Sequence, residues 1–203
     1  MRRGLLTWDA NELPVSTLDT RIGKIRDAMR AQNLDAFIAY TNIAKPAAVS
    51  WLCGFTPYWS EGLLYIPREG EIAFATALSK RVAEWISTVM PQGEVIPTPT
   101  PGNAIGKRLV AIGAKRIALS DLDDVPARQA QALFTEVKGL EIIDGSALFN
   151  SIRRHVDDPE RALVGKAADI ARESMLQVKA GSTSAQQLIS SCEGYARKAA
   201  IED

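Results

Sequence analysis

The sequence predicts an α/β protein in which a mixed, mostly parallel sheet is covered by helices and two further helices follow at the C-terminal end. Three observations support this. Between residues 1 and 150, short apolar runs typical of buried strands alternate with segments whose apolar residues recur at helical spacing. Two of the runs, 62–67 and 71–76, flank a turn with Pro67 and Gly70, which favours a β-hairpin. After residue 150 no strand-like run occurs.

The first elements follow from local signals. A helix is expected over 16–33, where Ser16 and Asp19 resemble a capping box. Its apolar face consists of Leu18, Ile22, Ile25 and Met29. The run "LDAFIAY" suits a buried strand, and a short helix over 43–51 is expected to stop at Gly54.

After the hairpin, strands and helices interleave in a regular order. A helix is expected over 79–90, and then strand 94–98, helix 104–113, strand 116–120, helix 126–137 and strand 140–144. This order predicts parallel strands joined by crossover helices.

The C-terminal residues have a different character. Asp157 or Asp158 can cap a helix that has Pro159 at its first position, and Ser184 can cap another. About fifty residues are too few for an independent core of much stability. We therefore expect residues 1–150 to form an α/β domain, 151–157 a linker, and 158–203 the first two helices of an incomplete domain.

Composition excludes several classes of protein. The 203 residues carry 24 basic and 24 acidic side chains, so no net field attracts nucleic acid or anionic lipid. The start lacks the apolar run of a secretory signal, and no window approaches a membrane span. Cys53 and Cys192 suggest no disulfide framework. These features predict a cytoplasmic, reduced protein that contacts neither membrane nor nucleic acid.

One short stretch, "SWLCGFTPYWSEG", holds four of the thirteen aromatic residues: Trp51, Phe55, Tyr58 and Trp59. Trp51 and Phe55 can be core anchors. Tyr58 and Trp59 follow a proline in a loop, and aromatic residues with a polar edge on loops are enriched where surface is buried on binding.

No catalytic motif is complete in these residues. The single histidine, His155, has arginine neighbours that oppose cation binding, and "SDLDDVP" reads as a polar loop before a helix. "GNAIGKR" has its glycines too close for a phosphate loop and lacks the following Ser or Thr. Cys53 reads as a small buried hydrophobe. The chain is therefore expected to bind no cofactor and to be inactive alone.

Three stretches resemble the creatinase, prolidase and aminopeptidase P family. "RIGKIRDAMRAQNLDAFIAYTNIAKPAAVSWLCGF" is similar to the family's opening, with Trp51 to Phe55 in place of its Tyr-Leu-Thr-Gly-Phe segment. "IRRHVDDPERALVGKAADIA" resembles its interdomain junction, with Asp157 or Asp158 where a Lys is usual. "VKAGSTSAQQL" is similar to its Gly-x-Thr-Glu turn, with Gln186 or Gln187 where Glu is frequent.

The resemblance implies a two-domain parent whose C-terminal domain holds two divalent metal ions on two Asp, one His and two Glu beyond residue 203. Its chemistry is hydrolysis of a C–N bond, in an Xaa-Pro peptide or a small metabolite such as creatine. In related homodimers the N-terminal domain leans over the partner's metal site. We therefore expect Phe55, Tyr58, Trp59 and Glu61 to line a lid or a dimer face that selects substrates by shape.

Two alternatives remain open. The chain can be a free-standing, non-catalytic module derived from this family that binds a ligand or a partner protein. It can also be an unrelated nucleotide-binding α/β protein, although no Gly-rich phosphate loop follows any expected strand.

Overall fold

The computed structural model describes residues 9–56, 60–177 and 184–199. Its contacts divide the chain into two units: a larger unit, Leu13–His155, and a helical unit, Val156–Asp203 together with Met1–Glu12. The division lies inside the expected linker 151–157.

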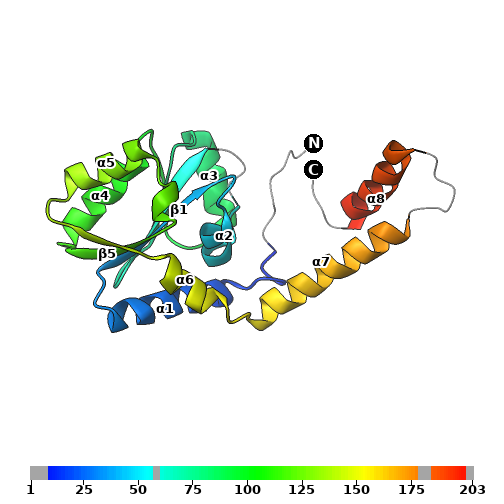
Figure 1. The fold of residues 1–203 in the computed structure, drawn as a ribbon, viewed down its shortest axis with the longest axis horizontal. Helices are drawn as coiled ribbons and strands as arrows, with labels where there is room; N and C mark the ends of the chain where they lie inside the picture. Colours follow the sequence, from blue (N-terminus) through cyan, green and yellow to red (C-terminus); the bar gives the residue numbers. More distant parts are fainter. Residues whose placement is uncertain (1–8, 57–59, 178–183, 200–203) are drawn as a thin grey trace. The chain divides into compact units, whose positions relative to one another are not determined.

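The larger unit is built on six strands (Figure 1). These are β1 (Ala36–Asn42), β2 (Glu61–Pro67), β3 (Ala73–Thr76), β4 (Glu94–Pro97), β5 (Arg116–Ser120) and β6 (Glu141–Asp144). The order across the sheet is β4-β3-β2-β1-β5-β6. Only β2 runs against its neighbours, since β1 and β3 pair with it in antiparallel fashion and the other pairs are parallel. The predicted mixed, mostly parallel sheet with one hairpin is confirmed.

Helices of the larger unit cover both faces of this sheet. They are α1 (Val15–Ala31), α2 (Ala47–Cys53), α3 (Lys80–Val89), α4 (Pro101–Ala111), the 3-10 turn η1 (Leu122–Asp124), α5 (Ala127–Glu136) and α6 (Ser146–Arg153). Figure 1 shows α4 and α5 together over one face, with α1 and α6 on the other side. Because both faces are covered, β1 is buried along nearly its whole length, as its continuous apolar run predicts.

Successive side chains of each strand point to opposite faces of the sheet and pack under the helices on either side. Ile38 and Tyr40 of β1 pack in one cluster with Ile105 and Leu109 of α4 and Leu133 of α5. On the other side, the predicted helical stripe of α1 is buried: Leu18, Ile22, Ile25 and Met29.

Two helix starts test the capping predictions. Asp157 caps α7 (Asp158–Leu176) by accepting a hydrogen bond from the Glu160 N–H at 3.0 Å, which confirms the prediction.

The predicted capping box at Ser16 is wrong, because α1 begins one residue earlier and its N-cap, Pro14, makes no side-chain cap. Inside the helix, the Ser16 carbonyl instead accepts a hydrogen bond from Thr20 Oγ1. The predicted stop at Gly54 is confirmed, with a left-handed backbone at φ 71°.

At the amino edge of the sheet, Asp35 joins β1 to β5. Its Oδ2 accepts hydrogen bonds from the N–H groups of Lys115 at 2.8 Å and Arg116 at 3.0 Å, and Oδ1 lies 3.0 Å from Arg68. Burial alone would raise the pKa of this carboxyl, but the two backbone hydrogen bonds and the neighbouring positive charges outweigh it and lower the pKa.

In the helical unit, α7 packs against α8 (Ala185–Ala199). Leu163, Ala167 and Ile170 lie on one face of α7 and line a groove of about 530 Å³ together with Cys192 and Ala196 of α8. Large apolar side chains remain exposed on these helices: Val164, Met175, Leu176, Leu188 and Ile189. Within the described residues, this unit offers little to cover its apolar side chains.

Candidate functional site

The carboxyl edge of the sheet gathers the polar side chains that can form a site. Strands β1, β3, β4, β5 and β6 end at this edge and β2 begins there, because β2 alone runs the other way. In open α/β sheets, ligands bind beyond the carboxyl ends of the strands. Asn42, Glu61 and Thr76 stand at these strand ends in neighbouring positions, since β1 and β2 pair through Asn42 and Glu61.

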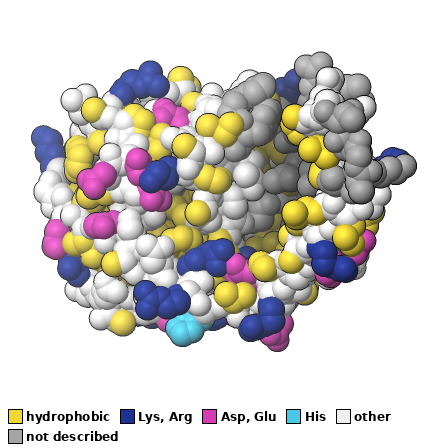
Figure 2. All heavy atoms as spheres, turned by 45° about the vertical axis from the view of Figure 1, so that its right-hand side comes forward, with side chains coloured by type: hydrophobic (Ala, Val, Ile, Leu, Met, Phe, Trp, Pro, Cys, Tyr) yellow, Lys and Arg dark blue, Asp and Glu magenta, His cyan; other side chains and the backbone are white. Residues whose placement is uncertain are grey.

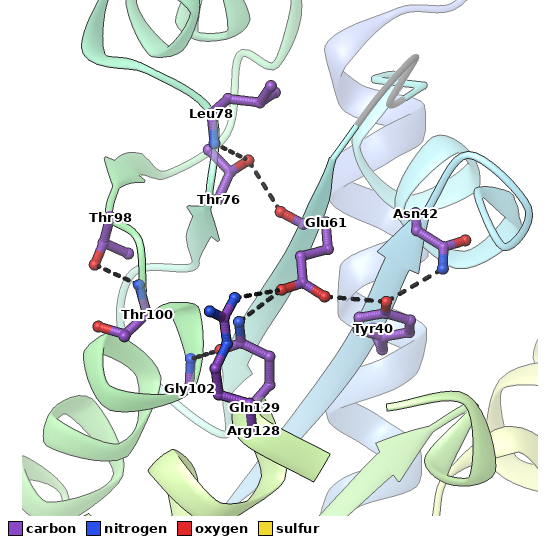
Figure 3. Close-up of polar contacts among 10 residues, drawn as sticks. All are labelled: Tyr40, Asn42, Glu61, Thr76, Leu78, Thr98, Thr100, Gly102, Arg128 and Gln129. Carbon is purple, nitrogen blue, oxygen red and sulfur yellow. Dashed lines mark hydrogen bonds and ion pairs between the residues drawn. The ribbon is translucent and has the colours of Figure 1, made fainter. Parts of the chain in front are cut away.

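Glu61, the first residue of β2, is the centre of this edge (Figure 3). Its Oε1 accepts a hydrogen bond from Gln129 Nε2 at 2.6 Å, and its Oε2 accepts one from the Tyr40 hydroxyl at 3.3 Å. Arg128 adds an ion pair at 3.7 Å from its own exposed side chain. The Glu61 side chain is 19% exposed. Its carboxylate therefore has partners from β1 and α5.

Tyr40 extends the network toward the end of β1. Its hydroxyl accepts a hydrogen bond from Asn42 Nδ2 at 3.2 Å while donating to Glu61. Burial raises the pKa of Tyr40 and outweighs the lowering by the hydrogen bond from Asn42, while the charge of Glu61 and the hydrogen bond to it raise the pKa further. Tyr40 thus remains a neutral donor to Glu61 across the physiological pH range.

Gln129 connects Glu61 to the start of α4. Its Oε1 accepts a hydrogen bond from the Gly102 N–H at 2.9 Å, which satisfies one of the free donors in the first turn of that helix. The helices approach closely here, because a Cβ built at Gly102 would lie 2.2 Å from the Gln129 carbonyl oxygen. Only glycine permits this distance, so the packing of α4 on α5 fixes Gln129 beside Glu61.

The backbone of Glu61 is held as well. Its carbonyl accepts hydrogen bonds from Thr76 Oγ1 at 3.2 Å and from the Ala77 N–H at 3.1 Å, while Thr76 Oγ1 also accepts one from the Leu78 N–H. Figure 3 shows Thr98 and Thr100 at the neighbouring end of β4, before α4 begins. The start of β2 is therefore fixed through both its main chain and its side chain.

The four residues predicted to face a substrate or a partner have different places. Phe55 is 1% exposed and packs edge-to-face against Phe74 and Trp85, so its side chain is a core anchor, as is Trp51. Glu61 lies at the carboxyl edge. Tyr58 and Trp59 fall outside the described residues. We call residues 57–59 the aromatic segment, by their sequence.

An acidic pocket of about 240 Å³ lies after β5 and β6 at the same edge. It is lined by Leu122, Ser146 and four aspartates: Asp121, Asp123, Asp124 and Asp144. Hydrogen bonds from Ser146 lower the pKa of Asp144, and Lys45 pairs with Asp124 at 2.8 Å. Across residues 9–56, 60–177 and 184–199, no group of three or more His, Cys, Asp and Glu has the arrangement to hold a metal ion. These residues do not fit a metal centre.

The remaining sequence candidates have structural roles. "GNAIGKR" lies within α4, and Cys53 is fully buried at the end of α2, where burial raises the pKa of its thiol. His155 follows α6 as an exposed residue. On the surface in Figure 2, basic and acidic side chains are intermixed, in keeping with equal numbers of the two charges. Among the described helices none is long and apolar enough to cross a membrane.

One feature of the sequence indicates a special role for Gln129. It stands four residues before Leu133 on a helix of residues 127–136, in a core-facing position where an apolar residue is usual. Its partners could not be found this way, because Gly102 and Glu61 are 27 and 68 residues distant.

Three solved structures with the same fold carry the names of peptidases. An X-Pro aminopeptidase from Thermotoga maritima matches with a TM-score of 0.74 and 17% identity, over 89% of this chain and 50% of its own. An Xaa-Pro dipeptidase from Bacillus anthracis matches with a TM-score of 0.68 and 19% identity, over 89% of this chain and 49% of its own. The N-terminal domain of the cytoplasmic peptidase PepQ from Mycobacterium tuberculosis H37Rv matches with a TM-score of 0.55 and 20% identity, over 66% of this chain and 98% of its own.

The chain thus spans about half the length of the first two of these proteins. At such identities the likeness shows the fold. No curated protein matches the sequence. Residues 21–155, most of the larger unit, match the family described as the Creatinase/Prolidase N-terminal domain, and the chain belongs to that family.

Proposed function

We propose that this chain is the N-terminal part of a dinuclear-metal C–N hydrolase, most closely of the Xaa-Pro peptidase kind, and that it is inactive by itself. Creatinase-like cleavage of a small metabolite is the other chemistry of the family. In the whole protein the larger unit shapes access to the substrate and takes part in a homodimer. We propose that the protein works in the cytoplasm, in line with the Mycobacterium relative, which is described as a cytoplasmic peptidase.

One observation carries the proposal. The likeness to the Thermotoga aminopeptidase covers 89% of this chain, whereas the larger unit, Leu13–His155, is only 143 of its 203 residues. The likeness must therefore reach into the helical unit, although it uses only half of the aminopeptidase. An N-terminal domain followed by the first helices of a second domain accounts for both facts.

The helical unit supports the same proposal. Its two helices leave large apolar side chains exposed, including Val164, Met175 and Ile189, which a complete second domain would cover. We propose that two divalent metal ions are held by residues of that second domain. They would polarise the scissile carbonyl and activate water there.

Hydrolysis of alanyl-proline tests the proposal. The protein expressed from the complete reading frame should hydrolyse this dipeptide when divalent metal is supplied, and a chelator should abolish the reaction. Residues 1–203 alone should show none. Hydrolysis by residues 1–203, or none by the complete protein with any divalent metal, would overturn the proposal.

The aromatic segment is proposed to serve shape selection and the dimer. Trp59→Ala in the complete protein should weaken the dimer or change the preference between dipeptide and tripeptide substrates. Phe134→Ala is the matched control, since Phe134 is an aromatic residue on α5 that is 47% exposed. If Trp59→Ala leaves both dimer affinity and preference unchanged, the segment has neither role.

A further inference from the structure

We propose that a cavity at the amino edge of the sheet binds a small zwitterion that carries an ammonium group, a carboxylate and an apolar side chain. The cavity has a volume of about 540 Å³, within the usual range for a small-molecule site. It is lined by one face of α1 and by the residues just before β3 and β4. All of these belong to the larger unit, so the proposal does not depend on the proposed function.

Gln92 provides the observation that points to a ligand. Its side chain lines the cavity, although the residue is only 9% exposed. Its Nε2 lies 3.5 Å from Asp19 Oδ1, at the outer limit of a hydrogen bond, and its buried Oε1 has no donor among the described residues. A buried acceptor without a hydrogen bond costs free energy, whereas a leucine of similar volume avoids that cost.

The donor that Gln92 lacks has to come from a molecule in the cavity. The last side-chain torsion of glutamine is soft, so a small turn of the amide brings Oε1 toward the cavity. Water can supply a donor as well as a larger ligand can. The other residues that line the cavity decide between the two.

Asp19 and Arg26 place opposite charges along one face of α1. They are seven residues apart, which separates their Cα atoms by about 10 Å along the helix axis. Arg26 Nε donates to the Pro67 carbonyl at 3.1 Å and Nη2 donates to the Gly70 carbonyl, while Nη1 has no acceptor among the described residues. The guanidinium group is therefore held in place with N–H groups left for a carboxylate. At the other end, Asp19 and Gln92 offer acceptors for an ammonium group.

Apolar side chains lie between and beside these charged groups. Ile22 stands on α1 between the two charged residues, and Ile72 precedes β3; each lines the cavity and is 5% exposed. Val15 and Pro91 add to the same lining. Such a surface favours an apolar group of the ligand over water. A donor at one end, acceptors at the other and an apolar wall together match a zwitterion with an apolar side chain.

The part of the cavity next to Gln92 is fixed by the backbone. Gly93 has φ 74°, and a Cβ built there would lie 2.3 Å from the Ile72 carbonyl oxygen, so only glycine fits. The Glu94 N–H donates to the same carbonyl at 3.1 Å. These contacts hold the segment before β4 against the segment before β3, and the cavity is therefore formed before any ligand binds.

The acidic residues of the cavity do not favour a metal ion. The Glu94 carboxylate is paired with Arg108 of α4, and Glu71 is exposed, where solvent screens its charge. No three His, Cys, Asp or Glu side chains in the described part of the chain are arranged to hold a metal ion. An organic ammonium group suits Asp19 and Gln92 better, because it offers several N–H donors to separate acceptors.

Nuclear magnetic resonance titrations of residues 1–203 test the proposal. The probes are leucine and alanyl-leucine, which both carry an ammonium group, a carboxylate and an apolar side chain; the tighter of the two shows whether the site takes a free amino acid or a dipeptide. The side-chain amide signals of Gln92 should shift with a dissociation constant of about 1 mM or lower. N-Acetyl-leucine lacks the ammonium group and leucinamide lacks the carboxylate. Each should bind about tenfold more weakly than leucine, because each loses a charge-assisted hydrogen bond.

Two variants separate recognition from structure. Asp19→Asn removes the charge of an exposed side chain and should weaken binding of the tighter probe about tenfold, whereas Asp27→Asn, an exposed acid of α1 outside the cavity, should not. Gln92→Leu should weaken binding about tenfold and yet raise the melting temperature by about 2–4 °C, because it removes the unpaired acceptor. Gln131→Leu, at an exposed position of α5, is its control and should change neither.

The results that would overturn the proposal are specific. One is no shift of the Gln92 signals with either probe at about 10 mM, ten times the expected constant. Another is equal binding of leucine and N-acetyl-leucine. A third is a Gln92→Leu variant that binds the tighter probe as the unmodified protein does, whatever its melting temperature. If Gln92→Leu does not fold, Asp19→Asn with its control and the two modified probes decide by the same criteria.

Discussion

Replacing Phe55 by alanine tests the assignment of this residue to the core. Its ring lies 5.6 Å from that of Phe74 and 6.0 Å from that of Trp85, at interplanar angles of 61° and 67°. Truncating a buried phenylalanine costs about 3–5 kcal/mol, and edge-to-face pairs account for about 0.5–1.5 kcal/mol each of such stabilisation. With two such pairs and 1% exposure, we expect a loss of about 4 kcal/mol in the free energy of unfolding.

Urea unfolding followed by tryptophan fluorescence measures this loss. For a slope of about 2 kcal/mol per molar urea, the midpoint should fall by about 2 M. Phe134→Ala, on a side chain 47% exposed, is the control and should cost less than about 1 kcal/mol. If both substitutions cost the same small amount, Phe55 is not a core anchor, and the whole aromatic stretch must be reconsidered as surface.

Three other predictions concern stability and reactivity. Folding lowers the pKa of Asp35, so the ionised side chain stabilises the fold above about pH 4, and this stabilisation is lost as pH falls through the lowered pKa. Asp35→Asn should therefore cost about 1.5–3 kcal/mol in the free energy of unfolding at pH 7 and make stability depend less on pH in the acid range. Gly102→Ala should destabilise the larger unit by about 1–3 kcal/mol through its clash with α5, whereas Gly165→Ala, with open space around it in α7, should stabilise by about 0.5–1 kcal/mol. In the native protein a thiol reagent should modify Cys192 and not Cys53 until urea unfolds the chain.

For each of these three predictions, one result would contradict it. If the stability of Asp35→Asn follows that of the unmodified protein from pH 7 to pH 2, the hydrogen bonds of Asp35 to Lys115 and Arg116 do not stabilise the junction of β1 and β5. Equal effects of the two glycine substitutions would mean that the close approach of α4 and α5 is relaxed in solution. Rapid modification of both thiols would show that α2 opens.

Local patterns predicted most elements of the fold because they report burial and spacing. The helical stripe of α1 and the continuous apolar run of β1 needed no knowledge of partners. The start of α4 was expected at Ala104, but the helix begins at Pro101. Proline is tolerated at the first helical position, because the N–H that it lacks would have no partner inside the helix there. Over residues 146–153 the pattern predicted no element, and α6 is short enough to escape a periodicity argument.

The site was less accessible to such reasoning. Glu61 was chosen for its place beside the aromatic residues, but its partners Tyr40 and Gln129 depend on strand register and on the docking of two helices. Phe55 was grouped with Tyr58 and Trp59 by proximity in sequence, although the turn after Gly54 directs it into the core. Distance in sequence, rather than residue type, limited the prediction.

Determining the coding sequence beyond the codon for Asp203 tests most directly whether this chain is the N-terminal part of a metallohydrolase. We expect the frame to continue for about two hundred residues, since this chain covers 50% of the Thermotoga aminopeptidase. The added residues should include the two Asp, one His and two Glu, in that order, that the family resemblance implies. A stop codon directly after Asp203 would contradict it. The chain would then be a free-standing module of this family, whose function would lie in binding a partner.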